Sequence, residues 1–187
     1  MFDRLRMAAI FVGVSAVALL AGVAYTGNAA TPAASLQIGA AAPDFAGING
    51  WLNSPPLDMK QLKGKVVLVD FWTFDCINCA HTIPHVEDWY ARYRDQGLVV
   101  VGVHTPEYSF EHDTGNLKNA VRRLGIQYPI AQDNQYATWN AYGNQYWPAL
   151  YLFDRSGRLV YSHLGEGRYG ETEQQIRTLL GLKVPRS

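Results

Sequence analysis

The sequence predicts an α/β domain built on a central mixed β-sheet flanked by helices. Three apolar, β-branched runs read as buried strands, over residues 65–71, 98–103 and 149–153. Helix-like patterns separate these runs, and a strand–helix–strand order gives parallel strands. The turn at residues 154–157 is followed by a segment that can pair back as a hairpin, which adds an antiparallel pair.

The first strand leads into the longest predicted helix. This helix starts at Cys76 and is ended by Gly97, and Pro84 inside it predicts a kink. Its apolar side chains recur at helical spacing, at Ile83, Val86, Tyr90 and Tyr93. After the second strand we expect a helix, an extended piece, a short helix, a strand, its hairpin partner and an amphipathic terminal helix, over residues 116–124, 128–131, 136–142, 149–153, 158–164 and 171–180.

The N-terminal part is predicted to be a targeting segment rather than part of the fold. Two arginines precede an uncharged apolar run over residues 7–24, so residues 1–27 are expected to form a signal peptide or a membrane anchor. The positive charges ahead of this run predict that the rest of the chain is exported. Residues 28–36 are predicted to form a tether, and residues 37–187 are predicted to form one domain.

The charge balance argues against one class of partner. The chain has 16 basic and 16 acidic residues, and no basic patch stands out. Nucleic acid is therefore not expected as a partner. Contact with a membrane is expected only through the N-terminal segment.

The two cysteines of the chain, Cys76 and Cys79, form a Cys-x-x-Cys pair at a strand–helix junction. Such a pair can pass two electrons by cycling between dithiol and disulfide. As a structural staple it would close a very short loop and remove little chain entropy. A zinc site would need two further ligands. We therefore expect a redox-active pair, with no bound metal and no cofactor.

A longer pattern surrounds this pair. It joins Val-Asp-Phe-Trp, the Cys-x-x-Cys pair, a proline five residues past the second cysteine and a proline just before a later strand. The residues concerned are Asp70, Trp72, Cys76, Cys79, Pro84 and Pro148. The pattern resembles that of thioredoxin, and it implies a thioredoxin fold with an N-terminal extension.

Further stretches narrow the resemblance. Ala-Pro-Asp-Phe at 42–45 and Leu-Lys-Gly-Lys at 62–65 resemble the exported TlpA and ResA class of thioredoxin-like proteins. A closer resemblance, over roughly residues 37–181, is to the periplasmic domain of DipZ-type thiol:disulfide interchange proteins. It is carried by residues 51–54, 76–79, 102–107 and 136–142. DipZ proteins usually fuse this domain to an electron-carrying membrane domain.

Roles for four residues follow. Cys76 lies at a helix N-terminus, which favours the thiolate, so it is the expected nucleophile. Cys79, one turn later, is the expected resolving thiol.

Asp70, six residues upstream on a buried strand, is expected to have a raised pKa and to exchange a proton with the buried thiol. The alternative is a strand-end acid that only forms a hydrogen bond with a loop. The resemblance implies that Pro148 is cis and faces the cysteines, so that a substrate backbone can pair with residue 147. The alternative is an ordinary trans turn proline.

Four more residues are candidates for substrate contact. Trp72 and Phe74 are predicted to frame the site, although such aromatic residues are more often packing. Trp147 precedes the proline. ResA-like reductases carry an acid at the place of Thr82, so Glu107 in a later loop is a candidate replacement, with a solvated loop acid as the alternative.

The local charges predict a reducing couple. No cation stands between the cysteines, and Asp75 directly before Cys76 should oppose its thiolate. We expect a reductant of protein disulfides at the periplasm or the outer face of the cytoplasmic membrane. The resemblance suggests the haem-binding cysteines of apocytochrome c as a substrate and, by analogy, a CcdA-type membrane protein as the electron donor.

Two other functions stay open at this point. Thr73 stands three residues before Cys76, as in the Thr-x-x-Cys of peroxiredoxins, but Val69 occupies the place of their proline. A copper-binding module could use the two cysteines with His104 or His163, although the cysteine spacing is wrong for that group. A metal pair on one helix face, at His81 and His85, is less expected than a surface helix.

Overall fold

The computed structural model describes residues 35–183. The predicted leader, residues 1–27, and most of the predicted tether lie outside the described residues. Among those that are described, no helix is both long enough and apolar enough to span a bilayer.

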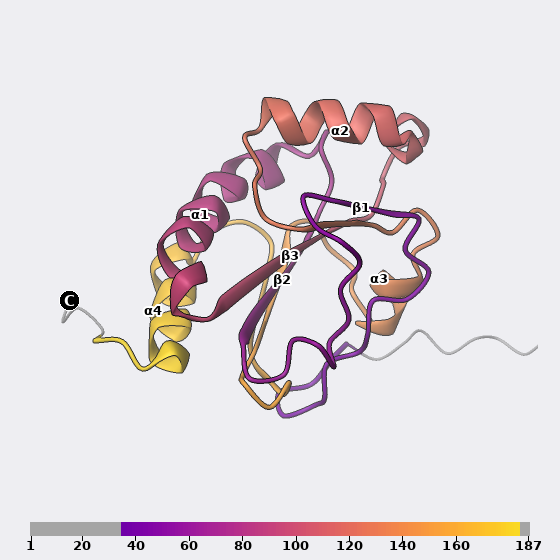
Figure 1. Cartoon of the computed structure of the whole chain (residues 1–187). Helices are drawn as coiled ribbons and strands as arrows, with labels where there is room; N and C mark the ends of the chain where they lie inside the picture. Colours follow the sequence, from indigo (N-terminus) through magenta and orange to yellow (C-terminus); the bar gives the residue numbers. More distant parts are fainter. Residues whose placement is uncertain (1–34, 184–187) are drawn as a thin grey trace, which may run out of the picture. The chain divides into compact units, whose positions relative to one another are not determined.

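A six-stranded mixed sheet forms the centre of the domain (Figure 1). Its spatial order is β1-β4-β3-β2-β5-β6. Strands β2, β3 and β4 run parallel, whereas β1, β5 and β6 pair antiparallel with their neighbours. The strands are β1 (Gly50–Leu52), β2 (Val66–Trp72), β3 (Leu98–His104), β4 (Ile130–Gln132), β5 (Ala149–Phe153) and β6 (Leu159–Leu164). The predicted mixed sheet is confirmed.

Helices cover both faces of this sheet. They are α1 (Ile77–Tyr93), α2 (Thr114–Arg123), α3 (Ala137–Ala141) and α4 (Tyr169–Leu180), with 3₁₀ turns η1 (Arg94–Gln96) and η2 (Ser109–His112). Buried side chains of α1, α2 and α4 join one apolar cluster, and those of α3 join a second cluster with segment 36–62. Figure 1 shows α1 and α4 beside each other, with α3 across the sheet.

Several boundaries differ from the predicted ones for local reasons. Helix α2 begins two residues early, because the side chain of Asp113 caps it by accepting a hydrogen bond from the Asn116 N–H at 2.8 Å. Helix α4 also begins two residues early. Strand β1 was not predicted; it is a three-residue edge strand, too short for a clear alternation.

The central strand β2 sends side chains into both halves of the core. Val66, Leu68 and Trp72 join the cluster beneath α1, while Val67, Val69 and Phe71 join the other cluster. The alternation places Asp70 on the α1 face, which also receives Cys79. All seven residues of β2 are buried. The buried strand therefore fixes where the following loop begins. That loop leads directly to the cysteine pair.

A glycine on β3 lets aromatic side chains close over Asp70. Gly102 pairs with Asp70 across the β2–β3 ladder. A Cβ at Gly102 would lie 2.6 Å from Ile130 Cδ1, 2.8 Å from Tyr128 Cε2 and 2.9 Å from Trp72 Nε1. We expect Gly102→Ala to lower the free energy of unfolding by about 1–3 kcal/mol, because a packed core cannot make room for the methyl group.

Urea unfolding measures this cost. Gly50→Ala is the matched control, since a Cβ on that strand glycine meets no atom within 4 Å. Equal stabilities for the two variants would contradict the close packing around Asp70.

Candidate active site

The cysteine pair lies where β2 ends and α1 begins. Cys76 is the N-cap of α1, in extended conformation, and its Sγ accepts a hydrogen bond from the Cys79 N–H at 3.2 Å. The two sulfurs are 2.6 Å apart and both thiols are free. Cys76 is half-buried, whereas Cys79 is fully buried. Only the first thiol can therefore meet a substrate sulfur.

The pKa values of the two thiols are shifted in opposite directions. The hydrogen bond from the Cys79 thiol, helped by the backbone of Cys79 and Asn78, lowers the pKa of Cys76 to about 7 despite partial burial. The carboxylate of Glu107 raises it in part. The same thiol–thiol bond and burial hold the pKa of Cys79 far above its ordinary range. This supports Cys76 as the nucleophile and Cys79 as the protonated resolving thiol.

Asp70 lies beneath the pair in an apolar setting. Burial raises its pKa from 3.8 to about 7; the Tyr128 hydroxyl, which donates to Oδ2 at 3.4 Å, opposes this in part. Its Oδ1 has no hydrogen-bond partner among the described residues. The charge of Asp70 in turn helps to raise the pKa of Cys79. A carboxyl group with this pKa can take the proton that Cys79 must lose.

Trp147 and Pro148 directly precede β5, the strand that pairs with β2. The peptide bond between them is cis, as the resemblance implied. Trp147 is half-buried; its indole N–H donates to the Thr105 carbonyl at 3.0 Å, and its ring packs against Trp139 at 4.3 Å between centroids. The substrate-binding roles of Trp147 and Pro148 stay predictions.

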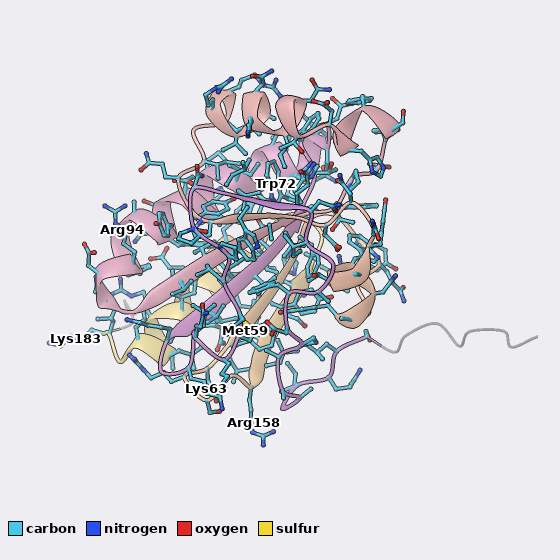
Figure 2. All side chains as sticks on the ribbon, turned by 45° about the vertical axis from the view of Figure 1, so that its right-hand side comes forward. Met59, Lys63, Trp72, Arg94, Arg158 and Lys183 are labelled. Atoms are coloured by element: carbon cyan, nitrogen blue, oxygen red, sulfur yellow. The ribbon has the colours of Figure 1, made fainter. Side chains whose placement is uncertain are left out.

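The prediction that Trp72 contacts the substrate is wrong. The side chain of Trp72 is 0% exposed and belongs to the core cluster beneath α1, so it offers no surface to a substrate. Figure 2 labels Trp72 among the densely packed side chains of the domain, whereas Arg158 projects from its lower edge. The physical reason is that both faces of β2 are covered, and packing beneath α1 buries Trp72 together with Leu68.

Two other predicted residues are accessible. Phe74 is partly buried and stacks on the His104 ring, with 5.4 Å between centroids. Glu107 is exposed in the loop after β3 and is close enough to act on the charge of Cys76. Thr82, by contrast, is buried and its hydroxyl donates to the Asn78 carbonyl at 2.9 Å.

A buried acid beside the loop that enters Cys76 was not predicted from the sequence. Glu111 is 0% exposed, and its carboxylate accepts hydrogen bonds from the Thr73 hydroxyl and from the N–H groups of Asp75, Glu107 and Tyr108. Burial alone would raise the pKa of Glu111, but these four bonds outweigh it and lower the pKa. A single glutamate in a short 3₁₀ turn has no distinguishing sequence pattern, and its partners Thr73 and Asp75 are 38 and 36 residues away.

The histidines of residues 35–183, the part that the structure describes, lie in separate surroundings. His104 is buried and its pKa is lowered to about 4, mainly by burial. His81 pairs with Glu166 at 3.1 Å, while His85 stacks on Tyr169 at 3.7 Å between centroids. In the part of the chain that the structure describes, no three His, Cys, Asp or Glu side chains are grouped to hold a metal.

Comparison with known proteins decides the family. Residues 38–162 match the AhpC/TSA family. The chain belongs to this family. It is 52% identical to the protein DipZ of Mycobacterium tuberculosis over 84% of its own length, but it spans only 24% of DipZ. It is 31% identical to the thiol-disulfide oxidoreductase YkuV of Bacillus subtilis, over 74% of this chain and 93% of YkuV.

Solved structures agree with this placement of the AhpC/TSA chain. A putative thiol:disulfide interchange protein DsbE from Chlorobium tepidum matches with a TM-score of 0.70 and 30% identity, over 79% of this chain and all of that one. A thioredoxin-like protein solved in its oxidised form matches with a TM-score of 0.72 and 31% identity, over 78% and 98%. The fold is therefore thioredoxin-like, and the domain is of the thiol–disulfide oxidoreductase class.

Proposed function

We propose that this AhpC/TSA-family domain reduces disulfide bonds in proteins outside the cytoplasm. The observation that carries the proposal is the division between the two thiols. Cys76 is accessible with a pKa of about 7, while Cys79 is buried and protonated. A dithiol arranged in this way attacks with one sulfur and releases the product with the other.

The chemistry transfers two electrons in two exchanges. The Cys76 thiolate attacks one sulfur of the substrate disulfide, forms a mixed disulfide and releases the other substrate sulfur as a thiolate. Cys79 then gives its proton to Asp70 and attacks the Cys76 sulfur, which releases the second substrate thiol. The domain is left with a Cys76–Cys79 disulfide, which a dithiol donor must reduce again.

Local electrostatics favour the reducing direction. A stable thiolate makes a disulfide a stronger oxidant, and the strong oxidant DsbA has a thiol pKa near 3.5, compared with about 7 in thioredoxin. Cys76 has a pKa of about 7, and the nearby Glu107 carboxylate raises that pKa rather than lowering it. These features support a reductant.

The place of action and the partners are inferred from the sequence. The predicted leader, residues 1–27, and the likeness to DipZ support export to the periplasm or the outer face of the cytoplasmic membrane. Haem-binding cysteines of apocytochrome c are a proposed substrate. A CcdA-type membrane protein is a proposed donor, since a reductant in an oxidising compartment needs a supply of electrons.

The Thr73-x-x-Cys76 spacing does not favour a peroxidase in this structure. The Thr73 hydroxyl donates to the buried Glu111 carboxylate, so its proton is not directed at a peroxide on Cys76. Thr73 itself is fully buried. Disulfide exchange is therefore the function that the geometry supports best.

Turnover of two substrates tests the proposal. With dithiothreitol as the donor, we expect the protein to reduce the disulfides of insulin catalytically and to consume hydrogen peroxide no faster than the free donor does. Peroxide consumption without insulin reduction would contradict the proposal and favour the peroxidase.

A further inference from the structure

The carboxylate of Glu111 connects two loops that meet beside the cysteine pair. One oxygen, Oε1, accepts from the Thr73 hydroxyl and from the Asp75 N–H at 3.0 Å, in the loop that enters Cys76. The other, Oε2, accepts from the N–H groups of Glu107 and Tyr108 at 2.7 and 2.9 Å, in the loop after β3. Four donors from two segments thus converge on one fully buried side chain.

This arrangement requires a carboxylate rather than any polar group. Each oxygen faces two donors, and an ionised carboxylate only accepts hydrogen bonds. A glutamine of the same shape would place its NH₂ group against two donors on one side. Because a buried donor without a partner is costly, either Asp75 or the Glu107–Tyr108 pair would have to move. Glutamate is therefore specific at this position.

The two connected loops carry aromatic side chains that pack against one another, of which Phe74 is two residues before Cys76. Phe74 lies in the first loop and its ring is 5.9 Å from that of Phe110 in η2. Phe110 in turn stacks on Tyr108, with 5.7 Å between centroids and 3° between planes. Tyr108 and Phe110 are 48% and 47% exposed. We call Phe74, Tyr108 and Phe110 the aromatic rim.

We propose that Glu111 is a positioning residue that fixes the aromatic rim against the Cys76 loop, so that the rim receives apolar side chains flanking a cysteine in a polypeptide substrate. The inference rests on the proposed function. The Glu111 side chain does not touch the substrate. It acts through the two loops, of which one presents the reactive sulfur and the other the apolar surface.

The role predicts a difference between large and small substrates. A polypeptide disulfide gains contact with exposed aromatic surface, and such surface contributes most to binding when it is held in place beforehand. A small uncharged disulfide, such as hydroxyethyl disulfide, needs only the Cys76 sulfur. Loss of the Glu111 carboxylate should therefore raise KM for the polypeptide and leave the small substrate nearly unaffected.

The test compares Glu111→Gln with a capping variant on the same segment. Asp113→Ala removes the N-cap of α2, two residues away, and leaves the cysteine loop untouched. We expect Glu111→Gln to lower kcat/KM for insulin about tenfold, mainly through KM, and to change the value for hydroxyethyl disulfide by less than about threefold. Asp113→Ala should lower Tm with neither change.

Hydrogen exchange provides a readout that does not depend on activity. The amides of Asp75, Glu107 and Tyr108 should exchange about tenfold faster in Glu111→Gln than in the wild type, and at the wild-type rate in Asp113→Ala. Thr73→Val, which removes one of the four donors, is the milder variant if the glutamine variant does not fold. In Thr73→Val the same amides should exchange about threefold faster than in the wild type.

Two results would overturn the inference. One is an equal loss on insulin and hydroxyethyl disulfide, and the other is unchanged amide exchange in the variant that folds. Failure of the proposed function would look different, since the wild type would then reduce neither substrate while the exchange of the three amides would still report on Glu111.

Discussion

A Cys76→Ser variant is expected to reduce insulin no faster than the donor alone, a loss on the order of a thousandfold or more. The physical reason is that Cys79 cannot replace it. The Cys79 thiol is fully buried, and burial and the charge of Asp70 still raise its pKa when the bond to the Cys76 thiol is lost, so it is neither accessible nor readily ionised at neutral pH. A serine hydroxyl at position 76 is not a nucleophile towards sulfur under these conditions.

Cys79→Ser is the matched control. This variant should also lose turnover, but for a later step, because Cys76 can still attack and then has no resolving thiol. It should accumulate mixed disulfides through Cys76 that are visible on a non-reducing gel, and these could be isolated to identify natural partners. Mixed disulfides on the Cys76→Ser variant instead would reverse the assigned order.

An Asp70→Asn variant should be more stable than the wild type at alkaline pH and slower in the second exchange. Burial raises the folded-state pKa of Asp70 from 3.8 to about 7, so between these values the folded protein holds a proton that the unfolded chain has lost. The contribution of Asp70 to the free energy of unfolding therefore falls as pH rises through this range. Asparagine removes this penalty, which is roughly 4 kcal/mol at most.

Urea unfolding at several pH values measures the stability effect. The advantage of Asp70→Asn should be largest near pH 8 and should shrink as the pH approaches 4. In single-turnover experiments the variant should resolve the mixed disulfide about tenfold to a hundredfold more slowly at pH 7, because Cys79 has lost its proton acceptor. A pH-independent stability difference together with an unchanged resolution rate would contradict the role of Asp70.

Local patterns explain what the sequence could predict. The cysteine spacing, the apolar run before it and the helical periodicity after it are all contained within about 30 residues, and they placed Cys76 at the start of α1 and Asp70 on a buried strand. The same periodicity located most helices and strands to within two residues. The cis bond before Pro148 came from the resemblance rather than from any local rule.

The remaining features depend on contacts between distant residues. Whether Trp72 points outward or inward was decided by packing beneath α1, which a motif does not specify. Glu111 acquires its partners only when the loop after β3 meets the loop before Cys76. Strand β1 forms because β4 offers a free edge, not because Gly50–Leu52 has a strong strand pattern.

The equilibrium potential of the Cys76–Cys79 couple tests most directly whether this domain is a reductant. The protein would be equilibrated in redox buffers of defined potential, and the fraction with free thiols would be measured after quenching with an alkylating reagent. A Cys76 pKa of about 7 predicts a couple in the reducing range, near that of thioredoxin at about −270 mV. A value close to −120 mV, that of the oxidant DsbA, would contradict the account.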